Sequence, residues 1–145
     1  MKNAIVVDID GVLLDTSNIF KELLELKLTG DSKWDYFYKY CNTEKIPFIE
    51  GTLNLLRSLH GIHIFLSTAR NERCRKETEQ KLLESYVSYC KLLMRRDNDF
   101  RPSHEVKKEH LEQIMQEYNI IAFIDDDLSN CQMAKELGIF TLRKV

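Results

Sequence analysis

Carboxylate, hydroxyl and cationic side chains follow three short apolar runs of this 145-residue sequence. The segments are Asp8-Ile9-Asp10-Gly11, Ser67-Thr68-Ala69-Arg70 and Asp125-Asp126-Asp127, and Lys107 opens a further helical stretch. If they share one edge of a sheet, at least three carboxylates meet there and repel one another unless a divalent cation is bound. Hard oxygen ligands favour Mg2+, which also takes a phosphate oxygen into its shell. Lys107 and Thr68 would then offer the phosphate a positive charge and a hydroxyl donor.

A parallel sheet would bring these segments together, and the apolar pattern predicts one. Continuous apolar runs predict strands over 4–7, 62–66, 89–94, 120–124 and 139–142. Helical stretches separate the runs: Gly30 and Gly138 stand where a glycine ends a helix, and Ser129 with Gln132 is typical of a capping box. Strands that alternate with helices predict right-handed βαβ units, whose ligands gather beyond the carboxyl ends of the strands.

Length and composition predict one domain without a membrane span. The chain is 43% apolar and 30% charged, and no apolar run reaches the roughly 20 residues of a membrane helix. The apolar run after Met1 is too short for a secretion signal, and the four cysteines form no Cys-x-x-Cys pair. We therefore expect a cytoplasmic protein with reduced thiols. A net charge of -2 excludes a general nucleic-acid coat but allows a local basic surface.

Four of these elements resemble the motifs of the haloacid dehalogenase (HAD) superfamily. They are Asp8-x-Asp10-Gly11-Val12, Thr68, the helical Lys107 and the late Asp125-Asp126, in the expected order along nearly the whole chain. The resemblance implies an α/β fold: a HAD-like, Rossmann-type αβα sandwich of three layers with a mostly parallel, five-stranded sheet. Residues 1–145 would form one phosphatase domain, with a minimal cap inserted at about 16–46.

The resemblance also implies catalytic roles. Asp8 would be the nucleophile that forms an aspartyl-phosphate, which divides one difficult hydrolysis into two easier steps. Asp10 would protonate the leaving oxygen and then activate water. Mg2+ would be held by Asp8, by the backbone carbonyl of Asp10, and by Asp125 or Asp126. Gly11 belongs to the substrate-binding set that the motif implies.

Two of these assignments have neighbouring alternatives. Ser67 could replace Thr68 in binding the phosphate, although the Ala-Arg that follows Thr68 resembles the Gly-Arg of the family and favours Thr68. Lys108 could replace Lys107, but the family lysine is usually followed four residues later by an apolar residue, and Leu111 fits Lys107.

The stretch 93–102, which continues to Val106-Lys107, is similar to the phosphatase domain of bacteriophage-type polynucleotide kinase-phosphatases. Those domains remove 3′-phosphates from nucleic-acid ends during repair. The resemblance implies that Arg70 contacts the scissile phosphate and that Arg96 or Arg101 positions the nucleic acid or the phosphate, because an arginine fork grips two oxygens at once. Between 91 and 108 there are six Lys or Arg against three Asp or Glu.

The sequence departs from that family in two respects. The family usually has an aspartate four residues before the lysine, and Ser103 stands there, so Glu105 would have to take over or the lysine is held differently. No Gly-x-x-x-x-Gly-Lys-[Ser/Thr] loop is present, which predicts a phosphatase without the kinase half.

The small insert predicts an open mouth that suits a chain end better than an enclosed metabolite. It carries an aromatic run, Trp34, Tyr36, Phe37, Tyr38 and Tyr40. These rings could stack on a base. The interpretation that we favour is a helical stripe of Trp34, Phe37 and Cys41 packed on the core, with half-exposed tyrosines.

Three functions follow from these patterns. The first is a Mg2+-dependent phosphohydrolase that removes 3′-phosphates from nucleic-acid ends in repair, through an aspartyl-phosphate. The second is a HAD phosphatase of nucleotides or another small phosphoester. The third is a non-catalytic HAD-fold binding domain. The retention of Asp8, Asp10, Lys107 and Asp125 opposes it, because a scaffold does not need such a costly group of charges.

Overall fold

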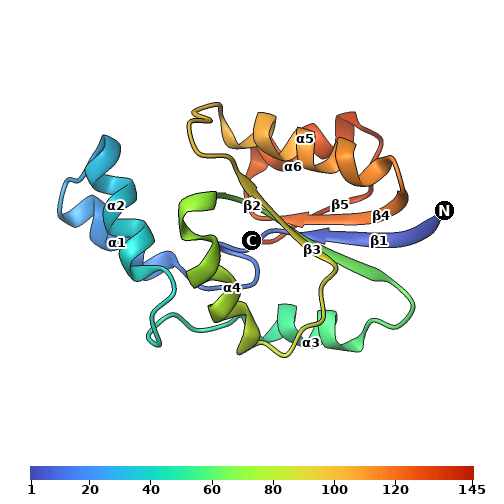
Figure 1. The fold of residues 1–145 in the computed structure, drawn as a ribbon, viewed down its shortest axis with the longest axis horizontal. Helices are drawn as coiled ribbons and strands as arrows, with labels where there is room; N and C mark the ends of the chain where they lie inside the picture. Colours follow the sequence, from blue (N-terminus) through green and yellow to red (C-terminus); the bar gives the residue numbers. More distant parts are fainter.

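The computed structural model describes all residues, 1–145, and consists of one five-stranded sheet between helices (Figure 1). The strands are β1 (Lys2–Val7), β2 (His63–Asn71), β3 (Lys91–Arg95), β4 (Tyr118–Asp125) and β5 (Thr141–Arg143). The helices are α1 (Ser17–Glu25), α2 (Gly30–Tyr40), α3 (Glu50–Ser58), α4 (Arg75–Leu83), α5 (Ser103–Met115) and α6 (Leu128–Glu136), and a 3-10 turn (Glu72–Cys74) precedes α4. No helix combines the length and the hydropathy that a membrane span requires.

The order of the strands brings their carboxyl ends to one edge. The sheet runs β3-β2-β1-β4-β5, and every neighbouring pair is parallel. After β3 the chain crosses to β4 on the other side of β1, so the direction of winding reverses beside β1. Ligands of open parallel sheets bind at such a reversal. The predicted α/β fold with a five-stranded parallel sheet is confirmed.

Two apolar cores lie on the two faces of the sheet. Helices α3 and α4 cover one face, and α5 and α6 cover the other (Figure 1). Successive residues of a strand point to opposite faces. Val7 of β1 therefore belongs to the core on the α3 side and Val6 to the core under α5 and α6, and both are fully buried. Burial on both faces explains why β1 is a continuous apolar run rather than an alternating one.

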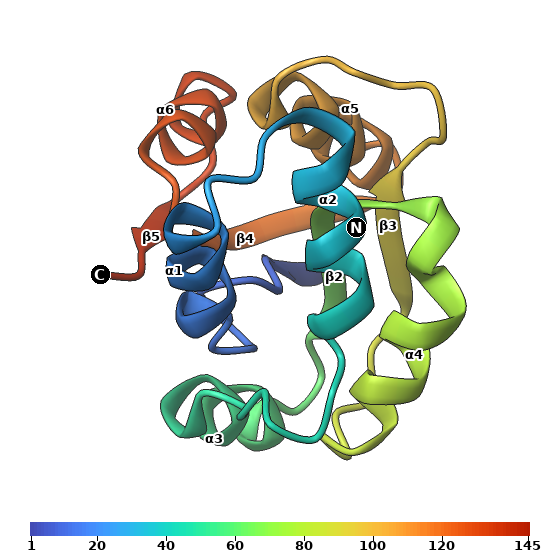
Figure 2. The same ribbon diagram turned by 90° about the vertical axis from the view of Figure 1, so that its left-hand side faces the viewer.

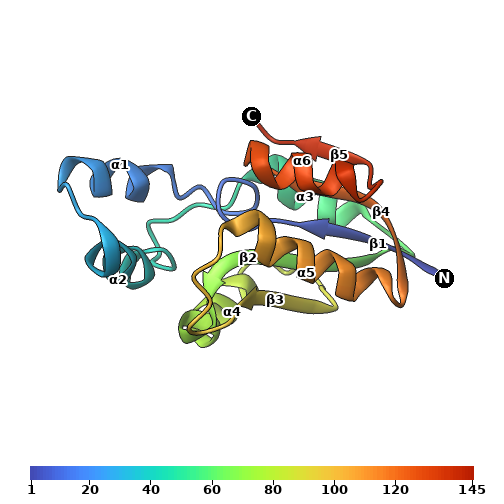
Figure 3. The ribbon, with the colours of Figure 1, turned by 90° about the horizontal axis from the view of Figure 1, so that it is seen from above.

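Helices α1 and α2 project beyond the carboxyl ends of the strands (Figures 1 and 3). They pack against each other through Ile19 and Leu23 of α1 and Phe37 of α2, which are all buried. The rings of Phe20 and Phe37 lie 5.1 Å apart. This pair of helices, which we call the cap, falls within the insert expected at about 16–46.

Two helix ends differ from the sequence prediction. Gly30 begins α2 rather than ending α1, which stops at Glu25 with Lys27 at a φ of 54°. Helix α6 is capped by Asp127, whose carboxylate accepts from the backbone N–H of Asn130 at 2.9 Å, and not by the predicted Ser129. An aspartate is as good a cap as a serine, and Asp127 lies between the end of β4 and the first residue of α6. Gly138 does follow α6, with a φ of 80°.

Candidate active site

The end of β1 places two aspartates in a tight loop at the carboxyl edge of the sheet. The backbone N–H of Asp8 still donates to Ile124 of β4, at 3.0 Å, so Asp8 is held as an extension of the strand. Gly11 follows with a φ of 82°, and a Cβ there would collide with the carboxylate of Asp126. Only glycine tolerates both the left-handed conformation and this close approach. The glycine therefore lets the loops after β1 and β4 meet.

Lys107 joins the ends of β1 and β4 from α5. Its Nζ donates to Oδ1 of Asp8 at 2.7 Å and to Oδ2 of Asp125 at 2.6 Å. All three side chains are at most 8% exposed. Burial disfavours the ammonium, but the two carboxylates outweigh that effect and raise the pKa of Lys107. Lys108, the alternative from the sequence, is exposed, and its Nζ lies 4.0 Å from Glu112 rather than beside the aspartates. The geometry therefore favours Lys107 for this role.

Three carboxylates converge beside this lysine. Asp8, Asp125 and Asp126 each offer an oxygen, and these oxygens lie within 4.8 Å of one another. Burial raises the pKa of Asp8; Lys107 opposes the rise, and Asp125 adds to it. Burial and then Asp125 raise the pKa of Asp126. One ammonium does not compensate three carboxylates, and hard oxygen donors at this spacing fit Mg2+.

The carboxylate of Asp10 is held by a buried arginine. Nε and Nη2 of Arg70 donate to its two oxygens at 3.0 and 2.7 Å. Burial disfavours the guanidinium charge, but Asp10 outweighs that effect and raises the pKa of Arg70. Two parallel charge-assisted bonds set both the distance and the plane of the carboxylate. Arg70 therefore fixes the orientation of the Asp10 carboxyl group, and each oxygen of Asp10 keeps a second lone pair for another contact.

The remaining donors of Arg70 are also occupied. Nη1 donates to Asn42 at 2.6 Å and to Thr78 at 3.1 Å, and Nη2 donates to the carbonyl of Cys41 at 3.4 Å. With the two bonds to Asp10, these contacts use all five N–H donors of a guanidinium. The contact with the scissile phosphate expected for Arg70 would require one of these bonds to break. In this arrangement Arg70 positions Asp10 and ties it to the end of the cap.

The two hydroxyls at the end of β2 have different partners. Oγ of Ser67 lies 2.8 Å from Nδ1 of His110, whose Nε2 lies 3.2 Å from the carbonyl of Met94. Because a carbonyl only accepts, Nε2 carries the proton and Ser67 donates to Nδ1. Burial lowers the pKa of His110 to about 4, which keeps the ring neutral. Oγ1 of Thr68 instead accepts from the backbone N–H of Arg70, at 3.1 Å, and its own proton has no acceptor within the chain, which favours Thr68 as the phosphate donor.

Sequence reasoning missed Asn130. Its Nδ2 lies 3.3 and 3.2 Å from the two oxygens of Asp125 and 3.2 Å from Oγ of Ser103, and Asn130 is only 2% exposed. Ser103 therefore acts on Asp125 through an amide, while Glu105 is exposed and does not take over. No local pattern distinguishes Asn130, since it is one of several polar residues in α6.

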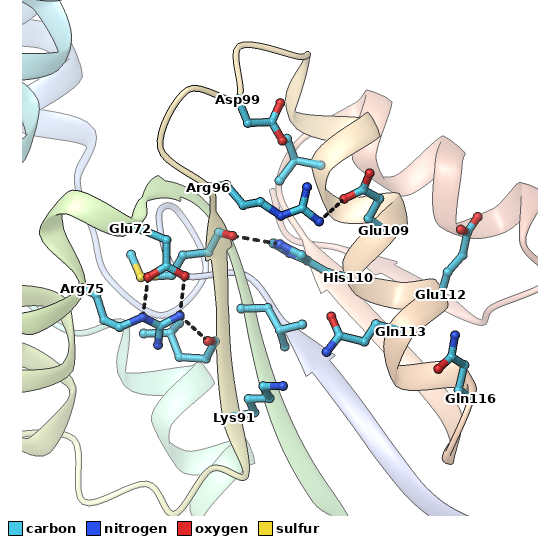
Figure 4. Close-up of a pocket in the computed structure, with 14 residues that line it drawn as sticks. Glu72, Arg75, Lys91, Arg96, Asp99, Glu109, His110, Glu112, Gln113 and Gln116 are labelled. Atoms are coloured by element: carbon cyan, nitrogen blue, oxygen red, sulfur yellow. Dashed lines mark hydrogen bonds and ion pairs between the residues drawn. The ribbon is translucent and has the colours of Figure 1, made fainter.

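Arg96 and Arg101 lie on the loop between β3 and α5 and bind the same glutamate. Nη2 of Arg96 donates to Glu109 at 3.1 Å, and Nη1 of Arg101 donates to its other oxygen at 2.7 Å. Arg101 also donates to both oxygens of Asp99, at 3.0 and 2.8 Å. Neither arginine contacts the carboxylates of the centre. Figure 4 shows Arg96 directed toward Glu109 at the rim of a separate cavity.

That cavity lies between the edge strand β3 and α5, and its volume is about 420 Å³. Arg75 covers the strand edge by donating to the carbonyl of Leu92 at 2.9 Å, and His110 forms part of the wall (Figure 4). None of the carboxylates that converge on Lys107 lines it. The convergent carboxylates and this cavity are thus different features of the molecule.

Comparisons with known proteins agree with this geometry. The family model described as HAD superfamily, subfamily IIIB (acid phosphatase), matches residues 1–142. No curated protein sequence matches the chain. Solved structures do: a chain of the Pnkp1/Rnl/Hen1 complex is 24% identical, with a TM-score of 0.78 over 99% of this chain and 46% of the other. The chain therefore spans less than half the length of that protein.

Two further solved structures are also similar. The class C acid phosphatase from Bacillus anthracis, solved with tungstate, is 19% identical, with a TM-score of 0.71 over 97% of this chain and 66% of that one. A HAD-family enzyme from Bacteroides thetaiotaomicron, solved with magnesium and inorganic phosphate, is 20% identical, with a TM-score of 0.57 over 100% and 94%. The chain belongs to the HAD superfamily, subfamily IIIB (acid phosphatase).

Proposed function

We propose that the protein is a Mg2+-dependent phosphatase that removes 3′-phosphates from nucleic-acid ends through an aspartyl-phosphate. The observation that carries the proposal is the convergence of Asp8, Asp125 and Asp126 beside Lys107 at the carboxyl edge of the sheet. The likeness to a chain of the Pnkp1/Rnl/Hen1 RNA repair complex supports the nucleic-acid substrate. The basic composition of 91–108 supports it independently, because a nucleic-acid backbone is a row of negative charges.

In the first step, Asp8 attacks phosphorus through the oxygen that Lys107 does not hold. A bond forms between that oxygen and phosphorus, and the bond from phosphorus to the ester oxygen breaks. Asp10 enters this step protonated, on a lone pair that Arg70 does not use, and gives that proton to the departing oxygen, while Arg70 keeps its carboxyl plane fixed. Thr68 and the third N–H of Lys107 donate to the phosphate oxygens.

In the second step, Asp10 takes a proton from a water molecule that attacks the phosphorus of the aspartyl-phosphate. The bond from phosphorus to Asp8 breaks, inorganic phosphate leaves, and both carboxyl groups return to their starting states. Mg2+, held by Asp8, by the backbone carbonyl of Asp10, and by Asp125 or Asp126, would neutralise part of the charge on these groups and on the phosphate. Asn130 and Lys107 keep Asp125 in place throughout.

A substrate panel tests the proposal. With Mg2+, a 3′-phosphorylated oligonucleotide should be hydrolysed at least about tenfold faster, in kcat/KM, than 3′-nucleotides, 5′-nucleotides or sugar phosphates, and EDTA should abolish the reaction. Faster hydrolysis of free nucleotides would favour the small-phosphoester function that the acid phosphatase family also suggests. If the protein hydrolyses none of these esters, the result would favour the third function, a non-catalytic binding domain.

The nucleophile has a matched test. Asp8→Asn should lower kcat by about 10^4-fold or more, because the covalent route is lost while the shape is kept. Asp35→Asn, at an exposed aspartate of α2 without an ion pair, should leave kcat unchanged. An Asp8→Asn protein with normal turnover would contradict the assignment.

A further inference from the structure

Helix α2 presents two stacked aromatic rings on one side. Trp34 and Tyr38 are four residues apart, so they lie on the same face of the helix. Their ring centroids are 6.3 Å apart, with an angle of 28° between the planes. The buried side of the helix is formed by Phe37 and Cys41, which are 2% and 0% exposed. The predicted packed stripe is correct for these two residues and wrong for Trp34, which is 42% exposed.

The two rings are connected to the end of β2. The hydroxyl oxygen of Tyr38 accepts from the backbone N–H of Asn71, at 3.1 Å, and the guanidinium of Arg73 lies 5.8 Å from the centre of the Tyr38 ring. Thr68 and Arg70 lie three residues and one residue before Asn71 on the same strand. Figure 2 shows α2 in front of these strand ends. The stacked rings of the cap therefore begin beside the end of β2.

Cations flank the rings at both ends. Nζ of Lys33 lies 4.8 Å from the centre of the Trp34 ring, and Arg73 lies over Tyr38. Trp34 does not belong to the buried core, and an edge-to-face contact with Phe37, at 6.0 Å between the ring centres, joins it to that core. An aromatic face beside a lysine suits a nucleotide, because a base could replace the lysine side chain on the indole while the ammonium turns to the neighbouring backbone phosphate.

We propose that Trp34, Tyr38 and Arg73, the aromatic strip, bind unpaired nucleotides next to the phosphate, so that the substrate is a single-stranded nucleic-acid end. This inference rests on the proposed nucleic-acid function and names its substrate class. Interior pairs of a duplex are stacked on both faces, and the last pair of a blunt end leaves only one face open, so successive bases can lie along the strip only when they are unpaired. Strand ends within a blunt duplex cannot use the strip without first fraying.

Trp34 is the only tryptophan of the chain, so its fluorescence reports on the strip directly. In the Asp8→Asn protein, which does not turn over, a single-stranded oligonucleotide with a 3′-phosphate should quench this fluorescence to saturation. A blunt duplex of the same sequence should quench it at least about tenfold less tightly, and inorganic phosphate should not quench it. Quenching by phosphate alone, or binding of labelled single strands without quenching, would overturn the proposal.

Kinetics give a second readout as the ratio of kcat/KM on a single-stranded 3′-phosphate to kcat/KM on a small chromogenic ester. Trp34→Ala should lower the ratio about tenfold, the size of one lost base stack, and Trp34→Phe should restore most of it. Phe140→Ala is the control, because Phe140 is an aromatic residue that is 65% exposed and precedes β5 at the opposite edge of the sheet. This control should leave the ratio unchanged.

The outcomes separate the two proposals. If wild type hydrolyses oligonucleotides and Trp34→Ala has the same ratio, or if blunt duplex ends react as fast as single strands, the strip proposal is wrong and the nucleic-acid function stands. If wild type hydrolyses only the small ester and no oligonucleotide quenches Trp34, both proposals are wrong.

Discussion

Two groups of paired charges differ in how they are built: the catalytic centre around Lys107, and the rim, which is the group Arg96, Asp99, Arg101 and Glu109 between β3 and α5. Lys107 and Asp8 are 99 residues apart in the sequence, and their side chains are at most 8% exposed. At the rim, Arg101 and Asp99 are two residues apart, and Arg101 is 37% exposed. The central pair joins a strand end and a helix that are far apart in the sequence, whereas the pairs of the rim join residues at most 13 positions apart. Charge changes should therefore affect folding at the centre and substrate binding at the rim.

Removing the central ammonium should have the largest effect. Lys107→Met leaves two buried carboxylates without their partner, which should lower the free energy of unfolding by about 3–5 kcal/mol. Urea denaturation at neutral pH with EDTA measures this. Lys108→Met, the neighbouring exposed lysine, should change it by less than about 0.5 kcal/mol. Equal losses in the two variants would contradict a stabilising role for the buried ammonium of Lys107.

The pH dependence of stability should reveal the neutral His110 beside the centre. Its pKa is about 4 in the folded protein and about 6.5 in the unfolded chain. The contribution is fully present above pH 6.5 and is lost as the pH falls toward 4, because the unfolded chain takes up the proton first. The full loss is about 3 kcal/mol, at 1.36 kcal/mol per unit. Urea midpoints of wild type should fall more steeply between pH 6.5 and 4.5 than those of His110→Gln; parallel slopes would contradict a buried neutral ring.

The contact between the two loops of the centre should be sensitive to one methyl group. Gly11→Ala should lower the free energy of unfolding by about 1–3 kcal/mol, because the left-handed backbone is strained and the methyl collides with Asp126. Gly138→Ala has a nearly identical φ but open space around its Cβ. Thermal denaturation of both variants isolates the collision, and the same loss in both would mean that backbone strain alone is responsible.

The rim should give the smallest change in stability. Arg96, whose side chain is 74% exposed, makes one surface ion pair with Glu109, so Arg96→Ala should change the free energy of unfolding by less than about 0.5 kcal/mol. Its kcat/KM on a 3′-phosphorylated oligonucleotide should fall more than that on a small chromogenic ester. Equal falls on the two substrates would move Arg96 from nucleic-acid binding to the phosphate or to a structural role.

Several features followed from the sequence because they depend on neighbouring residues. The strands were predictable because a doubly covered strand is a continuous apolar run, and β1 is one. The acidic segments at the ends of β1 and β4 were predictable because parallel strands share an edge. Helix ends were less predictable, since Asp127 and Ser129 are both good caps and only the path of the chain out of β4 selects Asp127.

Other features depend on side chains that meet only after folding. Arg70 is a phosphate ligand by resemblance, but the acceptors Asn42 and Thr78 come from elements that the sequence does not relate to it. Trp34 and Phe37 belong to one aromatic run, and only the position of α1 decides that Phe37 is buried while Trp34 faces outward.

The amino-acid sequence alone determined the α/β order of elements, the acidic strand ends and the lysine between them, because local apolar spacing and polar interruptions encode these. The tertiary structure decided which hydroxyl of Ser67 and Thr68 stays free, which lysine reaches Asp8, and that Asn130 holds Asp125. The physical reason is that each choice is a competition for a hydrogen bond among buried groups. Its outcome depends on which acceptors the packing of α5 and α6 against the sheet brings within about 3 Å.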